Sequence, residues 1–202
     1  DPEDDGLCVW AAYQPKGAAS FAASLLDLSG NGNNATDPGG VNTPTWDAVN
    51  GWQFDGTDDY LTTTFVPQND QSQSAFMQIT NQLQNQPFNF GAWQGGGKAF
   101  GIGAYNGLAP GNISYDNGGQ QLVANGIAAG NIGIAGARCY RNGVDEGVAL
   151  GAWAGASAVA VYIGIETGTG IYGQFYCQAF VIYDCTLTGV QSAAVAAAMA
   201  AL

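Results

Sequence analysis

Two stretches decide the fold of this chain: Leu28-Ser29-Gly30-Asn31-Gly32-Asn33-Asn34-Ala35-Thr36 and Gly51-Trp52-Gln53-Phe54-Asp55-Gly56-Thr57-Asp58-Asp59-Tyr60-Leu61. Glycine and asparagine dominate the first stretch, and both tolerate positive φ, so it predicts a turn rather than a helix or strand. The second stretch predicts a short strand, a tight Asp-Gly turn and a second strand. Together they indicate an all-β chain.

Short segments rich in β-branched and aromatic residues, separated by glycine-rich turns, recur along all 202 residues. The expected strands are Leu7–Tyr13, Trp52–Phe54, Tyr60–Phe65, Ala75–Thr80, Phe88–Trp93, Ala99–Tyr105, Ile113–Tyr115, Gln121–Ala124, Ile132–Tyr140, Val159–Ile165 and Gln174–Tyr183. Strands of this length and spacing predict a two-sheet antiparallel sandwich. The sequence shows neither an internal repeat nor a dividing linker, so we expect one domain over residues 1–202.

The C-terminus carries the one predicted helix. Thr188 can cap it, and Gln191 completes a capping box three residues later. Val195, Met199 and Leu202 fall on one face at helical spacing, while the rest is rich in alanine. We expect this helix to pack on a sheet; the alternative is that its uncharged far face docks on a neighbouring subunit.

The charge balance excludes several partners. Sixteen acidic residues face four basic ones, which gives a net charge of −12 and a pI of about 4.1. Such a field repels phosphate, so nucleic acid and anionic membrane surfaces are not expected partners. No apolar run is long enough to insert into a membrane. The sequence begins at Asp1 without an initiator methionine, as expected of a mature N-terminus or of a trimmed fragment, and either is consistent with export.

The four cysteines, Cys8, Cys139, Cys177 and Cys185, are spaced unlike zinc ligands, and the chain has no histidine. Their even number predicts two disulfides and an oxidising location. Three pairings are open, and sequence spacing does not choose among them. The competing interpretation is four buried free thiols that act as small apolar side chains.

Five segments resemble the laminin-G-like, concanavalin A-like jelly-roll family. Asp27–Asn33 resembles its "D-x-S-G-N-G-N" turn and Phe54–Tyr60 its "F-D-G-x-D-D-Y" turn. The later segments are Cys139–Val144, which resembles an "L-Y-x-N-G-x" hairpin, then Tyr162–Gly164 and the closing Phe180–Thr188. The resemblance extends from Gly6 to Leu202 and is weakest over residues 68–130. It implies a jelly roll used mainly for binding and for building surfaces.

The resemblance also implies a disulfide pattern. In this family the first and last strands usually lie side by side, which implies Cys8–Cys185 and leaves Cys139–Cys177 as the second pair.

Catalytic groups are scarce. Without histidine, a Ser-His-Asp or Cys-His mechanism is excluded. Glycosidases of this fold present carboxylates at alternating strand positions, whereas the acid pairs here, Asp58-Asp59 and Asp145-Glu146, are adjacent and would point to opposite faces of a strand. We therefore expect no enzymatic activity.

A calcium ion is the cofactor that the residues and the resemblance suggest. Calcium takes six to eight oxygen ligands, and Asp27, Asn31, Asn33, Asp58 and Asp59 could supply them if the two turns meet. The alternative is that Asp27 and the asparagines only form Asx turns that satisfy their own backbone.

Exposed tryptophans could form a platform for a sugar ring. Trp93 and Trp153 are the predicted ligand-binding residues, with Trp46 a further candidate, whereas Trp10 and Trp52 lie in strands and are expected in the core. Core packing is the alternative for all of them. Asn34 and Asn112 begin glycosylation sequons.

Three functions are compatible with the fold: a structural or display subunit of an extracellular or virion assembly, a carbohydrate-binding module, and an enzyme. Low charge, alanine- and glutamine-rich faces and the expected disulfides favour the first. The chain also reads as complete rather than as an appendage. The sequence therefore predicts a non-enzymatic subunit at a cell or virion surface, whose partners are copies of itself or other subunits; the alternative is a glycan-binding, calcium-dependent adhesion module.

Overall fold

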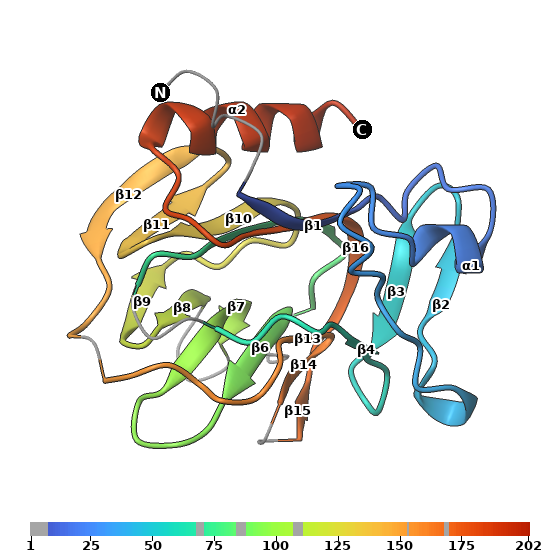
Figure 1. Ribbon diagram of the computed structural model, residues 1–202, viewed down its shortest axis with the longest axis horizontal. Coiled ribbons are helices and arrows are strands. Elements are labelled where there is room, and N and C mark those ends of the chain that lie inside the picture. The colour runs from blue at the N-terminus through green and yellow to red at the C-terminus, as the bar shows by residue number, and fades with distance from the viewer. Residues whose placement is uncertain (1–7, 68–70, 84–87, 107–110, 153, 168–169) are drawn as a thin grey trace.

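A computed structural model describes residues 8–67, 71–83, 88–106, 111–152, 154–167 and 170–202. Two eight-stranded sheets face one another, as the sequence predicted, and one C-terminal helix lies across the outside of one sheet (Figure 1). The chain is thus an antiparallel β-sandwich apart from one parallel pair, β14 with β6. No described helix is long and apolar enough to cross a membrane.

The first sheet has the order β12-β11-β10-β5-β16-β3-β2, with β1 also paired to β16. Its strands are β1 (Val9–Tyr13), β2 (Thr45–Asp47), β3 (Gly51–Asp55), β5 (Ser74–Thr80), β10 (Gly130–Ala135), β11 (Arg138–Arg141), β12 (Val144–Ala149) and β16 (Gln174–Tyr183).

The second sheet has the order β15-β14-β6-β7-β8-β9, with β13 and β4 joined beside β6. Its strands are β4 (Leu61–Thr62), β6 (Phe90–Trp93), β7 (Ala99–Asn106), β8 (Asn112–Asn117), β9 (Gln120–Ala124), β13 (Tyr162–Ile163), β14 (Ile165–Thr167) and β15 (Ile171–Tyr172).

Aromatic side chains fill the space between the two sheets. Phe180 of the first sheet packs on Phe90 of the second, with ring centroids 4.8 Å apart, and Phe90 packs on Phe100. Trp52 is fully buried, and its indole N–H donates to the Ser24 hydroxyl at the end of helix α1 (Phe21–Ser24). The sandwich therefore stands on one continuous core.

Helix α2 (Gly189–Ala200) covers a second apolar cluster on the outer face of the first sheet (Figure 1). It begins as predicted, because the Thr188 hydroxyl accepts from Gln191 N–H and the Gln191 side chain accepts from Thr188 N–H. Of the predicted face, Met199 is buried and Val195 packs against the cluster, whereas Leu202 is 39% exposed; Ser192 and Ala196 are buried as well.

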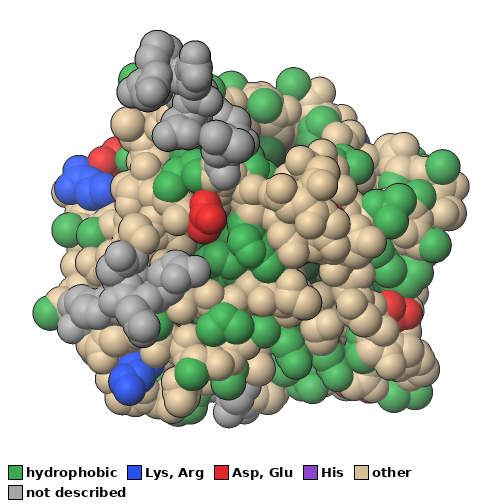
Figure 2. Space-filling view, in the orientation of Figure 1, with side chains coloured by type: hydrophobic (Ala, Val, Ile, Leu, Met, Phe, Trp, Pro, Cys, Tyr) green, Lys and Arg blue, Asp and Glu red, His purple; other side chains and the backbone are tan. Residues whose placement is uncertain are grey.

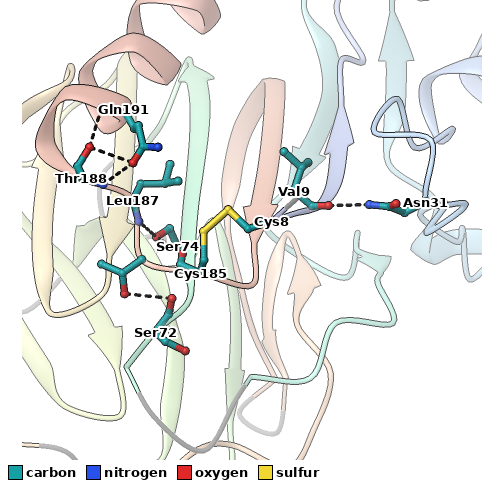
Figure 3. Close-up of a disulfide and its surroundings, with 10 residues drawn as sticks. Cys8, Val9, Asn31, Ser72, Ser74, Cys185, Leu187, Thr188 and Gln191 are labelled. Carbon is teal, nitrogen blue, oxygen red and sulfur yellow. Dashed lines mark hydrogen bonds between the residues drawn. A yellow bond between two sulfur atoms is a disulfide. The ribbon is translucent and has the colours of Figure 1, made fainter. Parts of the chain in front are cut away.

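One disulfide joins the ends of the sandwich. Cys8, just before β1, bonds to Cys185, just after β16 (Figure 3). The two cysteines meet because β1 and β16 are antiparallel neighbours, with Val9 opposite Tyr183.

The expected second disulfide does not form, since Cys139 and Cys177 are both buried free thiols. Cys139 lies on β11 and Cys177 on β16, and strands β10 and β5 separate these two strands in the first sheet. Adjacent strands lie about 4.8 Å apart, so the separation is far beyond disulfide reach. Burial raises the pKa of the Cys139 thiol to about 12, so it stays protonated.

Candidate functional site

The Asp27 turn fastens the first strand. The Asp27 carboxylate accepts hydrogen bonds from Ser29, through both its N–H and its hydroxyl, and from the N–H groups of Ala12 and Asn33. These four bonds hold the Asp27 pKa below its usual value against the opposing effect of burial. The amides of Asn31 and Asn33 donate to carbonyls of Val9 and Trp10. The polar side chains of the turn therefore hydrogen-bond to the backbone of β1 and hold this strand in place.

The Asp58 and Asp59 carboxylates belong to a different cluster. Their third member is Asp55, and one oxygen of each of these three carboxylates lies within 4.8 Å of the others. Asp27 is not a member of this group, so the predicted five-residue ligand set is divided between two places. Asp55 was missed although it stands in the same Phe54–Tyr60 motif.

This cluster, the acidic turn (Asp55, Asp58 and Asp59), begins at the last residue of β3. The Asp59 carboxylate accepts from Asp55 N–H and is 6% exposed. Burial, with the charges of Asp55 and Asp58, raises the Asp59 pKa to about 6 despite that bond. Gly164 lies against the turn so closely that a Cβ there would be 2.9 Å from the Asp59 carbonyl oxygen. Beside it, the Tyr60 and Tyr162 rings stack with centroids 5.6 Å apart.

An Asp27→Ala substitution is expected to lower the free energy of unfolding by about 2 kcal/mol, because the turn loses charge-assisted hydrogen bonds to β1. The loss, measured by urea unfolding, should be the same with calcium and with a chelator. Asp37→Ala, which removes two hydrogen bonds from an exposed turn, is the matched control and should cost less. A loss that appears only when calcium is present would contradict the structural role.

The tryptophans separate into structural and accessible ones. Trp46 N–H donates to the Pro15 carbonyl, Trp52 is buried, and Trp10 packs edge-on against Phe65. Trp93 differs, because it is 38% exposed and its indole N–H has no partner among the described residues. Trp153, the other predicted ligand-binding residue, lies outside the described residues.

Trp93 ends β6 and opens the turn to β7, which we call the Trp93 turn (residues 93–98). Gly95, Gly96 and Gly97 all have positive φ, and Gln94 N–H donates to the Lys98 carbonyl, which closes the predicted hairpin. The indole ring lies against Gly95, where a Cβ would be 3.8 Å from it.

Two polar residues of the Trp93 turn, Gln94 and Lys98, follow the Trp93 ring in the chain. The Gln94 side-chain oxygen accepts from Ala158 N–H, which leaves the Gln94 amide N–H groups without a partner among the described residues. Lys98 is exposed and forms no ion pair with a described residue. The turn therefore carries an exposed aromatic ring and, on neighbouring residues of the chain, amide and ammonium donors. Charged side chains are sparse over the face of the molecule seen in Figure 2.

The two sequons lie in different settings. Asn34 is exposed, and its side-chain oxygen accepts from Asp27 N–H, so it is part of the Asp27 turn. Asn112 is half-buried at the start of β8. Glycosylation at either residue stays a prediction.

Solved structures share this fold. Domain 4 of AbnA, a GH43 extracellular arabinanase from Geobacillus stearothermophilus solved with arabinotriose, aligns with a TM-score of 0.64 at 14% identity over 94% of this chain and 98% of that one. The receptor binding domain of botulinum neurotoxin D aligns at 0.62 and 13% identity, over 96% of this chain and 53% of that one. Trypanosoma rangeli sialidase aligns at 0.58 and 13%, over 92% and 32%.

These likenesses show the β-sandwich fold. No protein-family model and no curated protein matches the sequence, so membership of the laminin-G-like family stays a prediction. The chain spans about half the length of the neurotoxin domain and nearly all of the arabinanase domain.

Proposed function

We propose that this chain is a non-catalytic module that binds a carbohydrate through the Trp93 turn. The observation that carries the proposal is the exposed Trp93 ring, whose N–H has no partner among the described residues and whose turn also contains exposed Gln94 and Lys98. A flat aromatic face suits the apolar face of a sugar ring, and the donors suit its hydroxyl oxygens.

The structural neighbours favour this function over the structural-subunit prediction. One is an arabinanase domain solved with arabinotriose. Another is from botulinum neurotoxin type C, whose cell entry depends on interaction with two ganglioside molecules. Arabinan oligosaccharides and sialylated ganglioside glycans are therefore the first ligands to test. The disulfide adds support for an extracellular location. A role as an assembly or virion subunit stays an untested prediction.

The test is a glycan array that includes both classes of glycan, followed by titration of each glycan that binds. Trp93→Ala is expected to weaken binding at least tenfold, because the ring and its N–H are lost together. Trp46→Phe is the matched control: Trp46 donates within the fold, and its replacement should leave glycan affinity unchanged. Equal affinity of the wild-type protein and Trp93→Ala for every bound glycan would count against the Trp93 turn.

We also propose that the acidic turn can hold a calcium ion. Three carboxylates with oxygens this close repel one another. Burial raises the Asp59 pKa most, the charges of Asp55 and Asp58 add to it, and a divalent cation would relieve that repulsion. Calcium is then expected to raise the melting temperature by mass action, and magnesium to do so less.

Asp58→Asn should abolish the stabilisation by calcium, and Asp145→Asn, a change to a half-buried carboxylate outside the cluster that pairs with Arg138, should preserve it. A melting temperature that does not change when millimolar calcium is added would contradict the proposed calcium site.

A further inference from the structure

A hollow of about 410 Å³ lies on the outer face of the first sheet, beside α2. Its floor holds Gln78 of β5 and Asn131 of β10, which stand directly opposite one another on paired strands. Its walls are α2 and the turn between β11 and β12. The lining residues are Gln78, Gly130, Asn131, Asn142, Gly143, Val144, Ala193, Ala196, Ala197 and Ala200.

Two hydrogen-bond acceptors in this floor have no donor. The side-chain oxygens of Gln78 and Asn131 are buried and lack partners among the described residues, and Asn131 as a whole is 2% exposed. Buried amide oxygens are nearly always paired, because an unpaired one costs about 1–3 kcal/mol. Both residues line the same hollow, so a molecule held there could supply the missing donors.

The wall opposite the floor is fixed in place. The Asn142 side-chain oxygen accepts from Asn131 N–H at 2.9 Å, which ties the β11–β12 turn to β10. A Cβ at Gly143 would lie 3.1 Å from the Ala196 methyl, so the turn also lies close against α2. A hollow bounded in this way is preorganised and loses little conformational freedom when it is filled.

The lining sets the chemistry of the occupant. None of the lining residues is charged, which disfavours an ion, since calcium and phosphate sites use charged ligands. The floor calls for hydrogen-bond donors, and four alanine methyls present an apolar wall. The volume falls within the range of small-molecule sites.

We propose that this hollow is a second binding site, which takes a small neutral polyhydroxyl molecule: a single monosaccharide unit or a polyol. Its hydroxyls would donate to Gln78 and Asn131 while its C–H face packs on the α2 alanines. The site is on the outer face of the first sheet, whereas the Trp93 turn belongs to the second sheet, so the two proposals stand independently.

The test is an NMR titration of the whole chain with D-glucose, D-galactose, L-arabinose and glycerol. At least one of them is expected to shift the side-chain amide signals of Gln78 and Asn131 saturably. Asn131→Leu should weaken that binding at least tenfold. If Asn131→Leu does not fold, Gln78→Met is the second variant, and it should weaken binding in the same way. Trp93→Ala should leave it unchanged.

Absence of a saturable shift with all four compounds would overturn the proposal and leave the hollow to water. Unchanged affinity in both floor variants would overturn it as well. Binding that is lost in Trp93→Ala but kept in Asn131→Leu would support the Trp93 turn and refute this second site.

Discussion

Removal of the Cys8–Cys185 disulfide is expected to lower the free energy of unfolding by about 3–5 kcal/mol. The bond joins residues 177 positions apart, so it closes nearly the whole chain into one loop. In the chain-entropy account, a longer loop restricts the unfolded state more. It also holds the start of β1 against the end of β16, beside the Ser74 hydroxyl that bonds to the Cys185 carbonyl (Figure 3).

The measurement is urea unfolding of the double variant Cys8→Ser/Cys185→Ser. Cys139→Ala is the matched control, because it changes a buried cysteine that forms no disulfide. Reduction of the Cys8–Cys185 bond in the Cys139→Ala protein should lower its free energy of unfolding further, by about as much as the double substitution lowers that of the wild-type protein. Equal stability of the double variant and the wild-type protein would contradict the assigned pairing.

Asp116→Asn is expected to stabilise the protein at neutral pH by about 2–3 kcal/mol. Asp116 is 5% exposed, and burial raises its pKa to about 6 despite the hydrogen bond it accepts from the Ser114 hydroxyl. The folded state therefore binds a proton more tightly than the unfolded state does. Stability contributed by the protonated form is complete below about pH 4 and is lost as the pH rises through 6.

The wild-type melting temperature should accordingly rise as the pH falls from 7.5 to 5. Asp59, whose pKa is also raised to about 6, acts in the same direction. Asp27, whose pKa is lowered, reverses the trend only in more acidic solution. Asp116→Asn should exceed the wild type at pH 7.5 and match it near pH 4, whereas Asp145→Asn should show no such gain. A wild-type melting temperature that falls between pH 7.5 and 5 would contradict the assignment.

Local turn chemistry made much of the fold predictable. Asn-Gly at 142–143 and the three glycines before Lys98 form the hairpin turns expected of them, with positive φ at each position. The capping box of α2 was likewise readable, because its two partners stand three residues apart in the sequence. Such signals depend on near neighbours only, which is why a single sequence shows them.

Features that depend on long-range packing were harder to predict. The predicted strand Ile132–Tyr140 is in fact two strands, β10 and β11, because the chain reverses at Gly136 with a φ of +56°. Val159–Ile165 is divided at Gly164, where a Cβ would clash with Phe54 from the other sheet. Strand β2 was missed because it has three residues and is set by its pairing with β3.

The candidate sites show the same division. The sequence named Trp93 but could not tell it from Trp46, since the difference is a hydrogen bond to the distant Pro15 carbonyl. It joined Asp27 to Asp58 and Asp59 because both turns carry oxygen ligands that could meet at one ion, whereas in the fold Asp27 bonds to β1. The Gln78–Asn131 floor had no sequence signal at all, because it arises from the register of β5 on β10.

The most direct test of the central claim follows the tryptophan indole N–H signals by NMR while a bound glycan is added. Assignment of the signals uses one Trp→Phe variant for each tryptophan. The account predicts that the Trp93 signal moves furthest, while those of Trp46 and Trp52, which donate within the fold, stay in place. A glycan that binds without moving the Trp93 signal would contradict it.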